Sequence, residues 1–463
     1  MKKQETTNKL GTEKISRLLL SMGVPMILSM MLQALYNIVD SAFVSNMRVN
    51  GEAALNALTL AFPVQMLMVA IGVGTGVGTN ALLAKSLGQG DTKKAGRVAG
   101  NAMFLGMVIY ILFLLFGLFG VRVYIGTQTT NPMILEMAES YLAICCVFSI
   151  GIVFFAVFEK LLQATGRSYL STIGQIVGAV VNIILDPVFI YGLFGLPEYG
   201  VNGAAYATVI GQIVSWLVLM AFHFKYNVEI KNRWENMKPD WNVIREIYAI
   251  GLPAIIAQAL MSLMTYGLNV ILVRISETAV TAYGLYYKIQ QFILFAAFGL
   301  RDAITPIVSF NHGMRSRQRI KEGIRWGMIY TFIIMCAGLV VLELFAVPFS
   351  ALFGLAGETQ ALCISAIRII SLSFVFAGIN IAYQGIFQAL DSGIESLLLS
   401  VLRQFLFVIP VAWFFSLFAV GAPEKSWLVW LTFPIAEILT AAVGFVLMKR
   451  INTNKVDKME AEG

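Results

Sequence analysis

The first long apolar run of this chain is SRLLLSMGVPMILSMMLQALYNIVDSAFV, residues 16–44, and its one acidic residue is Asp40. A helix needs about 20 predominantly apolar residues to cross a bilayer core of about 30 Å, so this run can span a membrane. The whole chain has the same character, since 58% of its 463 residues are hydrophobic and 13% are charged. Soluble domains average about 25% charged residues. We therefore expect an all-α integral membrane protein.

Apolar runs of this length occur twelve times, in two sets of six. The first set occupies residues 16–44, 54–84, 97–121, 134–160, 168–193 and 201–224. The second set occupies residues 243–274, 279–309, 326–349, 359–388, 396–419 and 427–448. The longest polar segment separates the two sets. The sequence therefore predicts an N-terminal six-helix bundle in 1–224, a cytoplasmic linker in 225–242, a C-terminal six-helix bundle in 243–450 and a cytoplasmic tail in 451–463.

Basic residues are distributed unevenly between alternate loops. If the N-terminus is cytoplasmic, the inside loops contain Lys85, Lys93, Lys94, Arg97, Lys160, Arg167, Lys225, Lys231, Arg233, Lys238, Arg245, Arg315, Arg317, Arg319 and Lys321. The outside loops then contain little more than Arg48, Arg122, Arg274 and Lys425. This asymmetry satisfies the positive-inside rule. We expect a multi-pass protein of a bacterial-type plasma membrane with both termini cytoplasmic. Since the basic residues serve to orient the chain, we expect no nucleic-acid partner despite the net charge of +7.

The two sets of spans repeat one another. Three pairs of segments match in order, at an offset of about 223–228 residues: Gly23–Pro25 with Gly251–Pro253, Leu87–Gly90 with Phe310–Gly313, and Gln163–Gly166 with Gln388–Asp391. Because each half has an even number of spans, both halves enter the membrane in the same direction. The pattern predicts two pseudo-symmetric bundles of the parallel-repeat type associated with alternating access. A duplicated bundle with a purely structural role is the alternative.

Asp40 and Asp186 are acidic residues within the first and fifth spans. A carboxylate in hydrocarbon costs roughly 2.5–3.5 kcal/mol on insertion scales, so such residues usually face a cavity and take part in function. The alternative interpretation is an Asp at a helix end that reaches the membrane interface. Both residues nevertheless lie well inside runs of spanning length.

Two amide and hydroxyl side chains accompany these acids. Asn182 lies four residues before Asp186 and therefore on the same helix face. Counting about 1.5 Å per residue from the predicted surfaces places Asp40, Asn182, Asp186 and Thr208 at a similar depth in the first bundle. Two carboxylates in a poorly hydrated pocket should not both ionise readily. Such a pair can take up a proton or hold Na⁺ between its oxygens, and the pattern fits either ion.

Other polar residues within the spans have less definite roles. Arg301 and Asp302 are adjacent and point about 100° apart on a helix, so we expect them to pair with other spans rather than with each other. Together with Lys288 they are candidates either for structural ion pairs or for substrate handling. Tyr36 and Asn37, about one turn from Asp40, are candidates for the lining of a substrate cavity. We interpret Glu343 and Glu437 as helix-end or packing charges.

Several classes of protein are disfavoured by missing motifs. The four cysteines, Cys145, Cys146, Cys336 and Cys363, lack metal-ligand spacing and are expected to be small apolar fillers. The glycine-rich segment 72–78 superficially resembles a nucleotide loop, but it lies inside an apolar span without the phosphate-binding lysine, so we expect close helix packing or a bend. The chain contains no Walker motif and no catalytic cluster. We expect neither an enzyme nor a bound cofactor.

Six motifs occur in a characteristic order: LYNIVD at 35–40, GVGTG at 72–76, LGQGD at 87–91, QATGR at 163–167, NIILDP at 182–187 and GAAYAT at 203–208. In this order and spacing the chain resembles the MATE (multidrug and toxic compound extrusion) family over nearly its whole length. Within that family, YKIQQ at 287–291 and GLRD at 299–302 are similar to the MepA-type multidrug exporters of the DinF-like branch.

The resemblance implies a V-shaped pair of bundles that exports cationic or amphipathic drugs against an inward flow of H⁺ or Na⁺. In the DinF-like branch the coupling site lies in the first half, and its residues carry over to Asp40, Asn182, Asp186 and Thr208. If the ion is Na⁺, the first three of these would bind it. The partners are then small-molecule drugs and the lipid bilayer, and we expect a monomer.

The NorM-like branch of the family uses a Glu in span seven and an Asp in span ten. The corresponding positions in this chain are near Met261 and Gly378, with no acidic residue close by. This departure argues against a cation site in the second half. Two other classes remain: a lipid-linked oligosaccharide flippase of the same superfamily, which tends to have extra spans, and a membrane-embedded enzyme or receptor, which would need an extramembrane domain.

Overall fold

The computed structural model describes residues 8–47, 51–352, 357–422 and 425–460, and within these ranges every regular element is a helix. Ten of the described helices are long and apolar enough to cross a membrane, or up to twelve if each of two bent pairs counts as one span. The predicted all-α membrane fold is therefore confirmed. The predicted outside charge at Arg48 lies outside the described residues.

The chain separates into two compact units. The first, called here the N unit, is Leu28–Ile255, and the second, the C unit, is Met1–Ile27 with Ile256–Gly463. Two helices, α2 (Ile15–Ser45) and α10 (Trp241–Val273), contribute one part to each unit.

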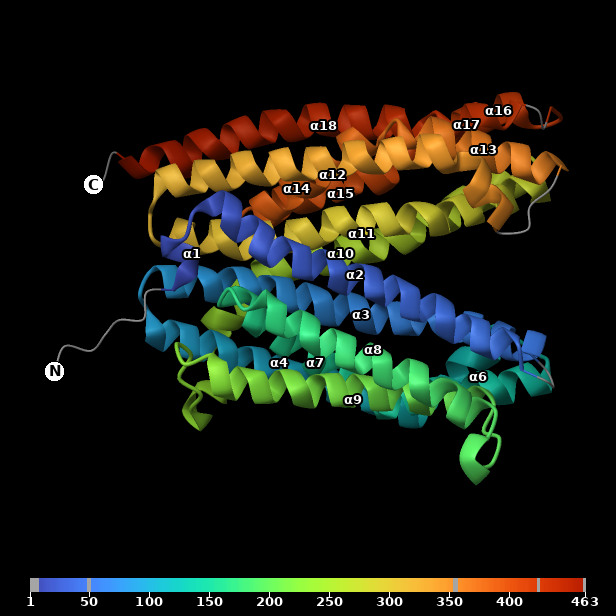
Figure 1. Ribbon diagram of the computed structural model, residues 1–463, viewed down its shortest axis with the longest axis horizontal. Coiled ribbons are helices and arrows are strands. Elements are labelled where there is room, and N and C mark those ends of the chain that lie inside the picture. The colour runs from blue at the N-terminus through green and yellow to red at the C-terminus, as the bar shows by residue number, and fades with distance from the viewer. Residues whose placement is uncertain (1–7, 48–50, 353–356, 423–424, 461–463) are drawn as a thin grey trace. The chain divides into compact units, whose positions relative to one another are not determined.

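The remaining helices of the N unit follow one another along the chain: α3 (Gly51–Gly88), α4 (Thr92–Phe119), α5 (Val121–Gly126), α6 (Pro132–Val147), α7 (Ile150–Ala164), α8 (Ser168–Ile190), η1 (Leu193–Gly195), α9 (Val201–Tyr226) and η2 (Trp234–Met237). Helix α9 packs against α6, α7 and α8, and α3 packs against α4, α6 and α7 (Figure 1).

The remaining helices of the C unit are α1 (Lys9–Thr12), α11 (Glu277–Gly313), α12 (Arg317–Leu352), α13 (Gly357–Ser371), α14 (Phe374–Ala389), α15 (Gly393–Val401), η3 (Leu402–Leu406), α16 (Val408–Ala419), α17 (Trp427–Trp430), α18 (Thr432–Ile451), η5 (Asn452–Val456) and η6 (Asp457–Glu460). Helix α11 packs against α12, α13 and α14, and α14 also packs against α18 (Figure 1).

The predicted bundle boundaries at residues 224 and 243 do not coincide with the edges of these units. The reason is close packing at glycines. A Cβ atom on Gly299 of α11 would lie 2.7 Å from the backbone of Ile27, so the first part of α2 packs on the C unit. A Cβ on Gly74 of α3 would lie 2.9 Å from the carbonyl oxygen of Gly251, so the first part of α10 packs on the N unit. The polar linker marks where the sequence repeats, and the unit edges lie inside α2 and α10.

Two spans are broken at matching places. The angle between α6 and α7 is 44°, and the angle between α13 and α14 is 54°. Helix α6 ends at Val147 and α13 at Ser371, which is 371 − 147 = 224 residues later, the offset of the sequence repeats. Each unit therefore has a bend in the fourth span of its half.

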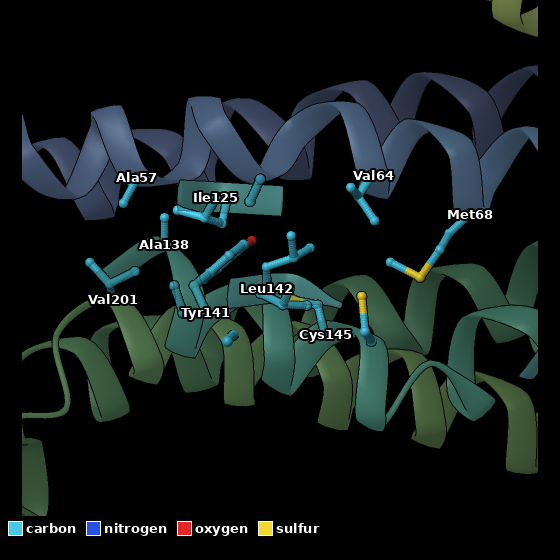
Figure 2. Packing of buried hydrophobic residues seen from close by; sticks show 14 of the residues in the cluster. Ala57, Val64, Met68, Ile125, Ala138, Tyr141, Leu142, Cys145 and Val201 are labelled. Atoms are coloured by element: carbon cyan, nitrogen blue, oxygen red, sulfur yellow. The ribbon is translucent and has the colours of Figure 1, made fainter. Parts of the chain in front are cut away.

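A cluster of buried apolar side chains joins α3, α5, α6 and α9 in the N unit (Figure 2). In this cluster Ala57 of α3 lies near Ala138 of α6, and Met68 of α3 lies on the side of Cys145 of α6. Lipid tails are as apolar as leucine, so close packing rather than escape from water stabilises such contacts in a membrane. The interpretation of the cysteines as apolar fillers is confirmed for Cys145, Cys146 and Cys363, which are buried and free.

Candidate functional site

The site is built on α8 of the N unit, which carries Asn182 and Asp186. Four residues separate them, so both lie on one face of the helix, and both are buried, with exposed fractions of 3% and 0%. The Nδ2 of Asn182 donates to Asp186 Oδ1 at 3.4 Å and to Thr208 Oγ1 of α9, also at 3.4 Å. Both distances are long for hydrogen bonds, so the amide holds the two oxygens loosely.

Asp40 of α2 completes the acidic part of the site. Its carboxylate lies within electrostatic range of the carboxylate of Asp186. One buried oxygen of each of three side chains has no hydrogen-bond partner: Oδ1 of Asp40, Oδ2 of Asp186 and Oδ1 of Asn182. Buried acceptors without donors are rare and costly in folded proteins. A proton bound by either acid, or a cation that prefers oxygen ligands, would relieve this cost.

The close approach of α8 and α9 positions Asn182 opposite Thr208. Small residues four apart face each other on the two helices: Gly174 and Gly178 on α8, and Gly211 and Ser215 on α9. The hydroxyl of Ser215 donates to the carbonyl oxygen of Gly174 at 2.6 Å. A Cβ on Gly178 would lie 2.8 Å from the carbonyl oxygen of Gly211. Such small-residue pairs allow helix backbones to touch in membranes.

A second group of polar side chains flanks Asp40. Tyr36, one turn earlier on α2, lies within electrostatic range of Asp40 and Asp186. In addition, Gln65 of α3 donates to the hydroxyl of Tyr141 at 3.1 Å, and Tyr141 is also within electrostatic range of Asp40. Sequence reasoning missed Gln65 and Tyr141. An amide within the apolar run 54–84 was the available signal, but single polar residues in such runs are common.

Asn37 and Lys288 are two further predicted candidates. Asn37 is in α2, and its side chain lies outside the described part of the chain. Lys288 of α11 is exposed. For these residues a substrate role stays a prediction.

The prediction that Arg301 and Asp302 do not pair with each other was wrong, because the structure shows an ion pair between them. Arg301 donates from Nε and Nη2 to Asp302 Oδ1, at 3.0 and 2.7 Å. Although adjacent side chains leave a helix about 100° apart, the long arginine side chain folds back to reach its neighbour. Its guanidinium also lies over the ring of Phe298, 4.9 Å from the centroid. Their predicted part in substrate handling stays a prediction.

Comparison with known proteins places this arrangement in a family. A model of the MatE family matches residues 25–188 and 253–414, one segment in each half of the chain. The multidrug export protein MepA of Staphylococcus haemolyticus is 23% identical over 449 residues, which cover 97% of each chain.

Solved structures share the fold. A multidrug resistance MATE family transporter of the MOP superfamily, solved in an outward-facing conformation, aligns with a TM-score of 0.89 at 24% identity and covers 97% of this chain and 99% of its own. A MOP superfamily transporter from Pyrococcus furiosus aligns with the same TM-score at 25% identity, over 98% and 99% of the two chains.

Proposed function

The chain belongs to the MatE family, and from this premise we propose that it is a secondary active multidrug efflux transporter of a plasma membrane. It exports cationic or amphipathic drugs in exchange for H⁺ or Na⁺ by alternating access. The likeness to MepA over 97% of the chain supports the export of drugs. The duplicated helical halves support alternating access. We further propose a monomer with both termini in the cytoplasm, as the distribution of basic residues predicts.

The observation that carries the ion-coupling part of the proposal is the set of unpartnered oxygens on Asp40, Asn182 and Asp186. They lie on helices that are apolar and long enough to span a membrane, where water is scarce. A bound proton or Na⁺ would satisfy these oxygens, and its release would leave them unpaired again. The site therefore has two states of different charge, and a coupled transporter needs such a pair of states.

The energy available is adequate for this task. One positive charge that moves inward through a membrane potential of ~150 mV supplies about 3.5 kcal/mol. At about 1.4 kcal/mol for each factor of ten, this sustains a drug gradient of a few hundred-fold. No nucleotide is required.

The experiment that tests the proposal is uptake of the fluorescent cation ethidium by everted membrane vesicles. An H⁺ or Na⁺ gradient directed out of the lumen should drive ethidium in, and the gradient that works identifies the coupling ion. Asp40→Asn and Asp186→Asn should abolish this uptake while the protein remains inserted. Glu198→Gln, at an exposed acid in the loop before α9, is the matched control and should transport normally.

Two results would contradict the proposal. Normal gradient-driven uptake by either Asp variant would remove the proposed ion site. A wild-type protein that responds to neither gradient would instead behave as expected of a flippase.

A further inference from the structure

The C unit contains a cavity of its own, at the bend between α13 and α14. Phe374 of α14 lines it, together with Phe298 of α11, Phe433 of α18 and two methionines of α10, Met261 and Met264. Aromatic rings present a negative face that attracts cations, and methionine is flexible and polarisable. These walls suit a flat, positively charged group.

An ion pair, Arg403 with Glu437, also lines the cavity. Both side chains are buried, with exposed fractions of 8% and 6%. Arg403 lies in η3, a π-helical turn that interrupts the helix between α15 and α16. Such wide turns are rare and frequently mark functional sites. Arg403 thus comes from an irregular turn, and its ion pair with Glu437 forms part of the cavity wall.

The two members of this pair are held differently. Asn380 of α14 donates from Nδ2 to Glu437 Oε2 at 2.8 Å and to the backbone oxygen of Glu437 at 3.0 Å. Glu437 is therefore fixed by a second side chain. Arg403 donates from Nε to Glu437 Oε1. If the pair opens, the carboxylate keeps its position and the guanidinium is the group that moves.

An acceptor without a partner lies beside the pair. Gln404, the residue after Arg403, lines the cavity with an exposed fraction of 6%, and its Oε1 is buried without a hydrogen-bond donor. The Oε1 of Gln291 on α11 also lines the cavity and lacks a donor. A ligand that carries several N–H groups would satisfy these oxygens, whereas an anion would not.

We propose that the C-unit cavity binds organic cations of the amidinium or guanidinium type, and that Arg403 is a tethered counter-ion which leaves Glu437 when such a cation arrives. The ligand takes over the ion pair with Glu437, donates to Gln404 and lies among the aromatic walls. A buried carboxylate left unpaired is costly, so the ligand must itself be a cation. The displaced guanidinium also needs an acceptor, and the unpartnered Oε1 of Gln291 in the same cavity wall supplies one. The proposal concerns a second site and stands whether or not the N-unit acids couple to an ion.

This exchange predicts that removing Arg403 and removing Glu437 have opposite effects on ligand binding, and an experiment can detect the difference. In the resting protein Arg403 competes with the ligand, and only the minor population with an open pair is ready to bind. Removing the arginine should therefore tighten binding, by about tenfold if about a tenth of the molecules are open at rest. Removing the glutamate should abolish it.

The test uses the purified full-length protein in detergent, with fluorine NMR to follow 4-fluorobenzamidine. The neutral isostere 4-fluorobenzamide is the matched control probe. The benzamidine should broaden saturably and the benzamide should not. Arg403→Gln should tighten benzamidine binding, Arg403→Lys should leave it near the wild-type value, and Glu437→Gln should abolish it.

The double variant Arg403→Gln/Glu437→Gln guards against misfolding, because it leaves no unpaired charge. It should keep the wild-type melting temperature and fail to bind. Equal weakening by the two single variants would show that the pair is only structural and would overturn the proposal, as would saturable binding by the double variant or none by the wild type. Glu198→Gln should bind benzamidine normally. Because the binding assay uses no ion gradient, a failure of coupled efflux cannot be mistaken for failure of this site.

Discussion

The close contact between α8 and α9 yields the sharpest structural prediction, because it positions Asn182 opposite Thr208. The perturbation is Gly178→Val. A Cβ at Gly178 would lie 2.7 Å from Ser215 Cβ and 2.8 Å from the oxygen of Gly211, whereas ordinary contacts are 3.4–4 Å. The helices must therefore separate by several tenths of an ångström or more. The Asn182–Thr208 hydrogen bond, already 3.4 Å long, would then be lost.

The expected magnitude follows from the cost of overpacking, about 1–3 kcal/mol for extra methyl groups in a filled interior. Gly178→Val should therefore melt at a lower temperature and should also transport ethidium poorly. The melting assay can use a maleimide dye that becomes fluorescent on reaction with thiols. Buried Cys145, Cys146 and Cys363 react only when the fold opens.

A matched control separates crowding from the change of residue type. Gly284 of α11 is also a glycine within a helix, and a Cβ there would meet nothing within 4 Å. Gly284→Val should change stability by about 0.5 kcal/mol or less, as is usual for unconstrained surface positions. If Gly178→Val melted and transported like this control, the contact between α8 and α9 would not be what positions the site.

Two further predictions follow from individual contacts. Thr208→Val removes the hydroxyl that accepts from Asn182, and it should raise the ion concentration for half-maximal efflux by about two- to tenfold, since a hydrogen bond contributes about 0.5–1.5 kcal/mol; an unchanged ion dependence would exclude Thr208 from the site. Asp302→Asn leaves the guanidinium of Arg301 without its carboxylate and should cost about 3 kcal/mol of stability in the same melting assay, as breaking buried pairs does. Asp457→Asn, at a more exposed pair with Arg317, is its control and should leave the melting temperature close to that of the wild type.

The helical architecture was predictable because the length of an apolar run is a local property. The neighbourhood of Asn182 and Asp186 was predictable for the same reason, since their spacing of four places them on one helix face. The depth of Asp40 and Thr208, which rests on counting residues along a helix, stays a prediction. Their meeting with α8 depends on how helices pack, and the length and pattern of a single apolar run do not specify that packing.

Other features depend on tertiary contacts and had no local signal. Arg403 and Glu437 are 34 residues apart on different elements, and nothing in either segment specifies the partner. Sequence reasoning looked for second-half acids near Met261 and Gly378 and interpreted Glu437 as a packing charge. The pairing of Arg301 with Asp302 was missed because the prediction used the angle between adjacent side chains on a helix and left out the length of the arginine side chain.

The two units show how one duplicated framework can carry different chemistry. Each has a bend in its fourth span, at residues related by the repeat offset. Near the N-unit bend, Cys145 lies within electrostatic range of Asp40 and so belongs to the surroundings of two carboxylates. At the C-unit bend, Phe374 lines a cavity whose wall also contains a carboxylate already paired with a guanidinium. Two acids gain a favourable partner when a proton or metal cation arrives, whereas a neutral pair can only exchange one cation for another. The ion dependence of transport should therefore follow the N-unit oxygens, and the preference for particular organic cations should follow Arg403 and Glu437.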